Sequence, residues 1–197
     1  MIKDSGNRRK FESGAQRDVQ AGKGRCDLIP LDAASMLLLD TDEVLVQING
    51  YVRTGDYNNL IDAIRTFISK RWCTDIPTAL LEVAIHYEEG ANKYDERNWE
   101  KGIPIHCYID SGVRHYLKFL RGDDDEPHNR AFIFNMLGAV WTHVNHPKLR
   151  DLPFAERMTR PVKFEDKGCV VCGGYAPEGT QICSNCKSKT IKEGEGK

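Results

Sequence analysis

The chain has 197 residues, 40% of them hydrophobic and 29% charged, which is typical of one ordinary globular domain with appendages. Its 28 lysines and arginines nearly balance 29 aspartates and glutamates, and the net charge of −1 excludes a global basic field for nucleic acid or an anionic membrane. No apolar run has the length of a membrane span, and no apolar segment follows the charged N-terminus, so we expect no signal peptide, no membrane partner and a cytoplasmic protein.

Residues 1–30 form a polar arm that ends in the sequence GKGRCDLIP. Two glycines flank Lys23 and allow the backbone to approach a ligand closely. The loop supplies two cations and one acceptor, which are Lys23, Arg25 and Asp27. Its spacing matches neither a P-loop nor a dinucleotide fingerprint, so a flexible basic tail stays open as an alternative to a nucleotide-contact loop.

Residues 31–76 are expected to be helical and carry no recognisable chemistry. Residues 31–39 form a short apolar pattern, and residues 57–72 carry an apolar stripe at helical spacing. The run at 44–48 between them is compatible with a strand or with more helix.

Three further helices are predicted between residues 75 and 143. The first begins at Asp75, a candidate cap followed by Pro77, and places an apolar face opposite a face with Glu82, His86 and Glu89. Its apolar face consists of Leu80, Val83, Ala84, Tyr87 and Ala91. The second runs from about Tyr108 to Arg121. The third, from His128 to about His143, is apolar nearly all round, which is typical of a central bundle helix. We therefore predict an all-α helical bundle in which Asn135 is buried and paired.

The last part of the chain predicts a zinc ribbon at residues 168–190, after a linker at 147–167. Two CxxC pairs separated by ten residues have the spacing of a closed tetrahedral zinc site. Its expected ligands are Cys169, Cys172, Cys183 and Cys186. A module this small has little apolar core, so the metal is expected to supply much of its folding energy in a structural role, or in docking a protein partner.

The second candidate site is spread over the helices of residues 77–146. Carboxylates at Glu82, Glu89, Asp110 and Asp125 converge if those helices pack together, as in bundle folds that bind cations. Basic and amide groups that would surround them are Lys93, Arg97, Asn98 and Arg114. Mg²⁺ prefers oxygen ligands and shares them with substrate phosphates. A solvated helix end with mixed charges is the alternative interpretation.

Five motifs in chain order, followed by a DEPH segment, resemble the phage-associated dATP/dGTP diphosphohydrolase family, one of the MazG-like all-α NTP pyrophosphatases. They are GAQRD (14–18), GKGRCDLIP (22–30), EGANKY (89–94), RNWEKG (97–102) and DSGVRH (110–115), then DEPH (125–128) and a helix with Asn135. The resemblance covers about residues 13–145. Residues 32–76 depart from it as an apparent insertion, and the ribbon is an appendage.

The resemblance implies hydrolysis of a purine deoxynucleoside triphosphate to the monophosphate and pyrophosphate. It implies Glu82, Glu89 and Asp125, with Asp110 beside them, as ligands of Mg²⁺ or Mn²⁺. Glu88 is an alternative to Glu89, and whichever of the two is not fully used as a ligand is the candidate proton acceptor. The implied substrate-binding residues are Lys23, Arg25, Asp27, Lys93, Arg97, Asn98, Trp99, Lys101, Arg114, His115, His128 and Asn135. It also implies a homo-oligomer, because members of this superfamily commonly pair helices between subunits.

A binding protein that keeps the fold without the activity is the competing hypothesis. Lys187, Lys189 and Lys192 favour docking of protein or nucleic acid at the ribbon, and Glu193 and Glu195 dilute that basic patch. No Ser–His–Asp or Cys–His arrangement is evident. The enzyme is therefore the favoured prediction, with a non-catalytic nucleotide-binding or ribbon-docking protein as the alternative.

Overall fold

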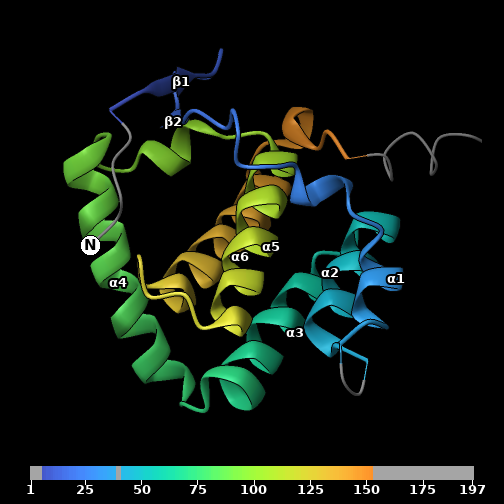
Figure 1. Ribbon diagram of the computed structural model, residues 1–197. Coiled ribbons are helices and arrows are strands. Elements are labelled where there is room, and N and C mark those ends of the chain that lie inside the picture. The colour runs from blue at the N-terminus through green and yellow to red at the C-terminus, as the bar shows by residue number, and fades with distance from the viewer. Residues whose placement is uncertain (1–5, 39–40, 153–197) are drawn as a thin grey trace, which may run out of the picture. The chain divides into compact units, whose positions relative to one another are not determined.

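The computed structural model describes residues 6–38 and 41–152 (Figure 1). The chain divides into two compact units, Met1–Met158 and Thr159–Lys197, and the second lies outside the described residues, as do the four ribbon cysteines. The first unit is built from helices with one two-stranded hairpin, so the predicted all-α class is confirmed. No described helix is long and apolar enough to cross a membrane.

The elements follow one another along the chain as a hairpin and then helices. In order they are β1 (Arg8–Lys10), β2 (Gln16–Asp18), the 3₁₀ helix η1 (Cys26–Leu28), α1 (Leu31–Ser35), α2 (Glu43–Thr54), α3 (Asn58–Thr66), the π-helical turn η2 (Phe67–Trp72), α4 (Ile76–Lys93), the 3₁₀ helix η3 (Asn98–Lys101), α5 (Ile105–Arg121), α6 (His128–Asn145) and the 3₁₀ helix η4 (Pro147–Leu149). The run at 44–48, for which the sequence allowed either a strand or a helix, is part of helix α2.

Side-chain caps fix where α2 and α4 begin. Asp75 accepts a hydrogen bond from Thr78 N at 2.9 Å and caps α4 where the sequence predicts it. Asp42 caps α2 in the same way through Leu45 N. Helix α5 ends at Gly122, whose φ of 82° lies in the left-handed region that glycine tolerates.

Helices α5 and α6 form the centre of the unit and approach each other closely. Gly138 allows this approach, since a Cβ there would lie 2.3 Å from Cε1 of Tyr108. The fully buried side chains of the two helices include Tyr108, Ile109, Tyr116, Phe132 and Ile133. These residues form the core on which the remaining helices pack.

The helices of residues 31–76 share this core rather than forming a separate body. The ring of Phe67 lies 4.6 Å from that of Phe132, and Tyr51 Oη lies 3.1 Å from His143 Nδ1. Tyr116 also donates a hydrogen bond to Asp42. The segment interpreted as an insertion thus contributes to the stability of the helices that follow it.

Helix α4 differs from its predicted orientation. Leu80, expected in the core, is 48% exposed, whereas His86, expected on the polar face, is 6% exposed. The apolar residues Ile76, Leu81 and Ile85 are also exposed. The reason is that α4 packs mainly against α6, on a narrow line that includes Ala79 and Val83, and forms one wall of a cavity along the rest of its inner side.

A cavity between the hairpin and three helices

A cavity of about 1050 Å³ occupies the first unit. Its lining residues come from β1, β2 and the loop after them, the C-terminal half of α4, η3, the outer side of α5 and the start of α6. In Figure 1 the hairpin lies across the C-terminal end of α4, beside the α5–α6 pair. The cavity therefore joins segments that are far apart in the sequence.

Two arginines, one from each strand of the hairpin, line the cavity as cross-strand neighbours. Arg9 and Arg17 are directly paired in the antiparallel register, where like charges repel unless something offsets them. Arg17 donates to Asn135 and lies 4.9 Å from the ring centre of Tyr108, and Arg9 donates to Cys107 Sγ at 2.9 Å. Arg9 Nε and Arg17 Nη1 are buried, and neither has a hydrogen-bond partner among the described residues. The pair is therefore suited to an anion.

Asp18 fastens the hairpin to the end of α4. Its carboxylate accepts hydrogen bonds from Arg8 at 3.2 Å, Lys93 at 2.8 Å and Tyr94 at 3.1 Å. The side chain of Lys93 is only 6% exposed and does not line the cavity. Lys93, predicted to bind the substrate, instead holds the hairpin in place.

Asp110 and Arg114 pin the glycine-rich loop to α5. Asp110 accepts hydrogen bonds from the backbone N of Cys26 at 2.7 Å and from Gln20 Nε2 at 2.9 Å, and it is ion-paired with Arg114. Arg114 also donates to the carbonyl of Lys23 at 3.2 Å. The Lys23 side chain lines the cavity. The loop is therefore held in place at its backbone, and its lysine reaches the cavity.

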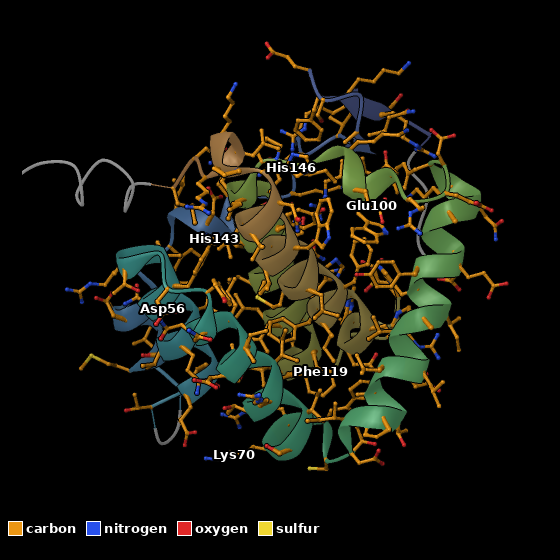
Figure 2. All side chains as sticks on the ribbon, turned by 180° about the vertical axis from the view of Figure 1, so that it is seen from behind. Asp56, Lys70, Glu100, Phe119, His143 and His146 are labelled. Carbon is orange, nitrogen blue, oxygen red and sulfur yellow. The ribbon has the colours of Figure 1, made fainter. Side chains whose placement is uncertain are left out.

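Asn98 joins η3 to the hairpin. Its amide accepts a hydrogen bond from Gln16 N at 2.8 Å and donates to Gln16 O at 2.9 Å, so it pairs with the strand backbone. The other end of η3 is held by His146, whose Nε2 donates to the carbonyl of Glu100 at 3.0 Å, and Figure 2 shows these two residues side by side. Both contacts fix η3 above the cavity.

An aromatic wall stands on the α4 side of the cavity. The rings of Tyr87 and Phe134 lie 4.8 Å apart with edge-to-face geometry, and Trp99 lies 5.9 Å from Tyr87. His86 joins them at 5.0 Å from Phe134, and burial lowers its pKa to about 4, so the imidazole is neutral near pH 7. This wall offers flat apolar surface to a ligand.

The four predicted metal carboxylates do not meet in one place. Glu82 is ion-paired with Arg130 and lies outside the cavity lining, as does Glu89. Asp110 is fully engaged with the glycine-rich loop and Arg114, as described above. Asp125 lines the cavity, where Lys118 at 2.9 Å and His128 hold its pKa at about 2. Among the described residues, the groups arranged to hold a metal ion instead contain histidine.

Ten of the predicted site residues line the cavity: Lys23, Glu88, Arg97, Asn98, Trp99, Asp110, Arg114, His115, Asp125 and Asn135. Seven do not: Arg25, Asp27, Glu82, Glu89, Lys93, Lys101 and His128. Of these, Arg25 is paired with Asp27, and Lys101 with Asp95. Asn135 is buried and bonded to Arg17 and to the carbonyl of Ala131, as predicted.

Sequence reasoning missed several lining residues, which include Arg9, Arg17, Gln20, Lys118 and Glu126. The GAQRD motif could have pointed to Arg17. The motif is part of the family resemblance and yet had no role in the predicted core, which leaves a role in the site. Arg9 gave no such signal, since it lies in an unpatterned basic segment.

A helical unit around a cavity with paired arginines and an aromatic wall is suited in charge and shape to a small anionic, partly aromatic ligand. Residues 65–152 match the model of a family described as dATP/dGTP diphosphohydrolase, N-terminal. The predicted resemblance to that family is thereby confirmed over this segment. No curated protein and no solved structure matches the chain. The hairpin and the glycine-rich loop lie outside the matched residues.

Proposed function

We propose that this protein hydrolyses a purine deoxynucleoside triphosphate, dATP or dGTP, to the monophosphate and pyrophosphate within the cavity. The observation that carries the proposal is the opposed pair Arg9 and Arg17, each with a buried N–H that lacks a described partner. A triphosphate oxygen would accept those hydrogen bonds and offset the repulsion between the two guanidinium groups. The match of residues 65–152 to a family described as dATP/dGTP diphosphohydrolase supports the choice of nucleotide and of reaction class.

The shape of the cavity supports a nucleotide as the ligand. A volume of about 1050 Å³ accommodates a nucleoside triphosphate, since small-molecule sites in proteins span roughly 300–1,000 Å³. The base would lie against the wall formed by Tyr87, Trp99 and Phe134. The phosphates would face the hairpin arginines and Lys23. Aromatic faces bind bases by stacking, whereas the guanidinium groups bind phosphate oxygens.

The reaction needs an attacking water and a proton acceptor. The water oxygen forms a bond to the α-phosphorus, the bond from that phosphorus to the bridging oxygen breaks, and pyrophosphate leaves with the electron pair. Glu88 lines the cavity and Glu89 does not, so we assign the water proton to Glu88. A divalent cation, Mg²⁺ or Mn²⁺ in the proposal, would neutralise the triphosphate. The residues Glu82, Glu89, Asp110 and Asp125 do not fit it as one ligand set.

Two further features of the proposal concern assembly. The exposed apolar residues of α4 support a homo-oligomer, because such a surface favours burial against a second copy. We also propose a structural Zn²⁺ held by Cys169, Cys172, Cys183 and Cys186, with a protein partner at the ribbon; the support is their spacing.

Pyrophosphate release from each common dNTP and NTP, measured with Mg²⁺ or Mn²⁺, tests the activity. Lys23→Ala should raise KM for the preferred purine dNTP about tenfold, since a charge-assisted hydrogen bond contributes ~1.5–3 kcal/mol. Lys70→Ala is the matched control, because Lys70 pairs with Glu43 away from the cavity. Nucleotide binding without pyrophosphate release, in folded protein with either metal, would instead favour a non-catalytic binding protein.

A further inference from the structure

Two histidines and a glutamate meet where α5 and α6 come together at the edge of the cavity. His115 comes from α5, His128 is the first residue of α6, and Glu126 lies in the segment between the helices. The Nδ1 atoms of the two imidazoles lie 3.0 Å apart, and Glu126 Oε1 lies 3.6 Å from the first and 3.8 Å from the second. Three donor atoms from separate residues thus face one small volume.

The proton of His128 is fixed on its far nitrogen. His128 Nε2 lies 2.9 Å from Asp125, whose carboxylate is also held by Lys118 at 2.9 Å and 3.1 Å. The Asp125 carboxylate accepts the Nε2 proton, so Nδ1 of His128 keeps a lone pair, which accepts a hydrogen bond from His115 Nδ1 at 3.0 Å. A carboxylate behind a histidine is the usual arrangement around metal-bound imidazole.

Ordinary hydrogen bonding does not account for Glu126. Distances of 3.6 Å and 3.8 Å are too long for hydrogen bonds, so the carboxylate is near both rings without bonding to either. The side chains of His115 and Glu126 are each 15% exposed, so the carboxylate and the rings approach one another largely shielded from solvent.

We propose that His115, Glu126 and His128 bind a divalent transition metal ion, such as Zn²⁺, Co²⁺ or Mn²⁺, at the wall of the cavity. Donors bound to one such ion at ~2.0–2.2 Å with tetrahedral angles are separated by roughly 3.4 Å, and the three separations here bracket that value. Imidazole ligands favour these ions over Mg²⁺, which prefers oxygen. Metal binding moves the His115 proton to Nε2, so that Nδ1 also presents a lone pair.

The metal would keep open positions toward the cavity. His115 and Glu126 line the cavity, and three protein ligands leave at least one coordination position for a substrate oxygen or water. Its use in nucleotide hydrolysis rests on the proposed function, whereas the binding itself does not.

A neighbouring group provides the competing site. Asp123, Asp125 and His128 also lie within reach of one ion. Asp123 is ion-paired with Arg121, however, and Asp125 with Lys118, so both carboxylates already have cationic partners. The two sites make different predictions for two carboxylates of the same segment, Glu126 and Asp123.

Titration of the full chain with Co²⁺, without nucleotide, tests the site. The proposed Cys₄ ribbon would also bind Co²⁺ and give a thiolate charge-transfer band, so the signal of interest is the difference between the parent and each variant. Glu126→Gln and His115→Gln should each remove a d–d absorption that lacks any thiolate band. Affinity should fall by about 100-fold or more, because loss of an outer partner alone costs ~10–100-fold.

Asp123→Asn and His86→Gln are the matched controls, and each should leave the Co²⁺ spectrum unchanged. His86 is a buried histidine of the cavity outside the group, and its variant reports general effects of removing such a ring. If His115→Gln fails to fold by circular dichroism, Glu126→Gln decides alone. An unchanged spectrum in Glu126→Gln, or its loss in Asp123→Asn, would overturn the proposal. Loss of hydrolysis with intact Co²⁺ binding would count against the proposed function alone.

Discussion

The imidazole of His106 joins the start of α5 to Asp151 at the end of the described chain. Its Nδ1 is ion-paired with the Asp151 carboxylate, which also accepts a hydrogen bond from the His106 backbone N at 3.0 Å. The Asp151 hydrogen bond, with a second contact to Cys107, raises the pKa of His106 to about 10. The ring is therefore charged at neutral pH and ties two distant segments together.

Replacing His106 should destabilise the protein in a pH-dependent manner. Because its pKa is raised in the folded state, the stabilisation is complete from about pH 5, where Asp151 is ionised, to pH 6.5, and it disappears as the pH rises through about 10. His106→Gln should lower the free energy of unfolding by ~1 kcal/mol from about pH 5 to neutral pH, where both partners are charged; this is the upper range for a partly exposed ion pair. Urea unfolding of the parent and of the variant, between about pH 5 and pH 6.5 and above pH 10, measures this difference in the free energy of unfolding. An equal difference at both would contradict the assignment to charge.

At the residue scale, the sequence indicated that a polar side chain would be buried and hydrogen-bonded, but it did not indicate which residue would be its partner. Asn135 was predicted to be buried and paired because an amide on an apolar helix has no other stable state. Its partner Arg17 lies 118 positions earlier, a distance over which no pattern in a single sequence reports contact. Glu82 was predicted to be a metal ligand from its face on the helix, and the structure pairs it with Arg130, which the helical pattern did not indicate.

At the scale of elements, the contact between α5 and α6 depends on glycine. Gly138→Ala places a Cβ 2.3 Å from Cε1 and 2.7 Å from Cζ of the buried Tyr108 ring. Overpacking of this kind costs ~1–3 kcal/mol, and we expect the free energy of unfolding to fall by that amount. Gly90→Ala in α4 is the control, because nothing lies within 4 Å of its Cβ position and alanine favours helix by up to ~1 kcal/mol. Denaturant unfolding of both variants checks the opposite signs; destabilisation by both would contradict the steric explanation.

Helix positions followed from the sequence where caps and long periodic patterns coincided. The start of α4 at Asp75 and the extent of α6 are examples, since a cap or an 18-residue apolar helix leaves few alternatives. The five-residue run at 44–48 was too short to separate strand from helix, and tertiary packing on α3 decided it. The exposure of apolar residues on α4 could not be predicted from the sequence. An apolar stripe indicates that a helix face is buried, but it does not say whether the same chain or a second copy covers that face.

At the scale of the whole molecule, α4 presents an apolar surface to its outside. Ile76, Leu80, Leu81 and Ile85 are 49%, 48%, 74% and 39% exposed, and all lie in the first ten residues of the helix. In Figure 1, α4 forms one edge of the described helices, so this side meets no other described element. Single exposed leucines are common, whereas four large apolar residues on one stretch of helix favour association.

Leu81→Asp should therefore convert an oligomer to monomers. A buried, unpaired carboxylate in the interface costs several kcal/mol, enough to reduce the association constant by ~100-fold or more. Light scattering coupled to size-exclusion chromatography measures the mass at equal protein concentrations. Leu37→Asp is the matched control, because Leu37 is 87% exposed on the segment after α1. If the parent is already monomeric, or if both variants retain the parent mass, then the α4 surface does not pair two copies. The proposed binding of purine dNTP should persist in the monomeric variant, because the lining residues described here come from a single chain.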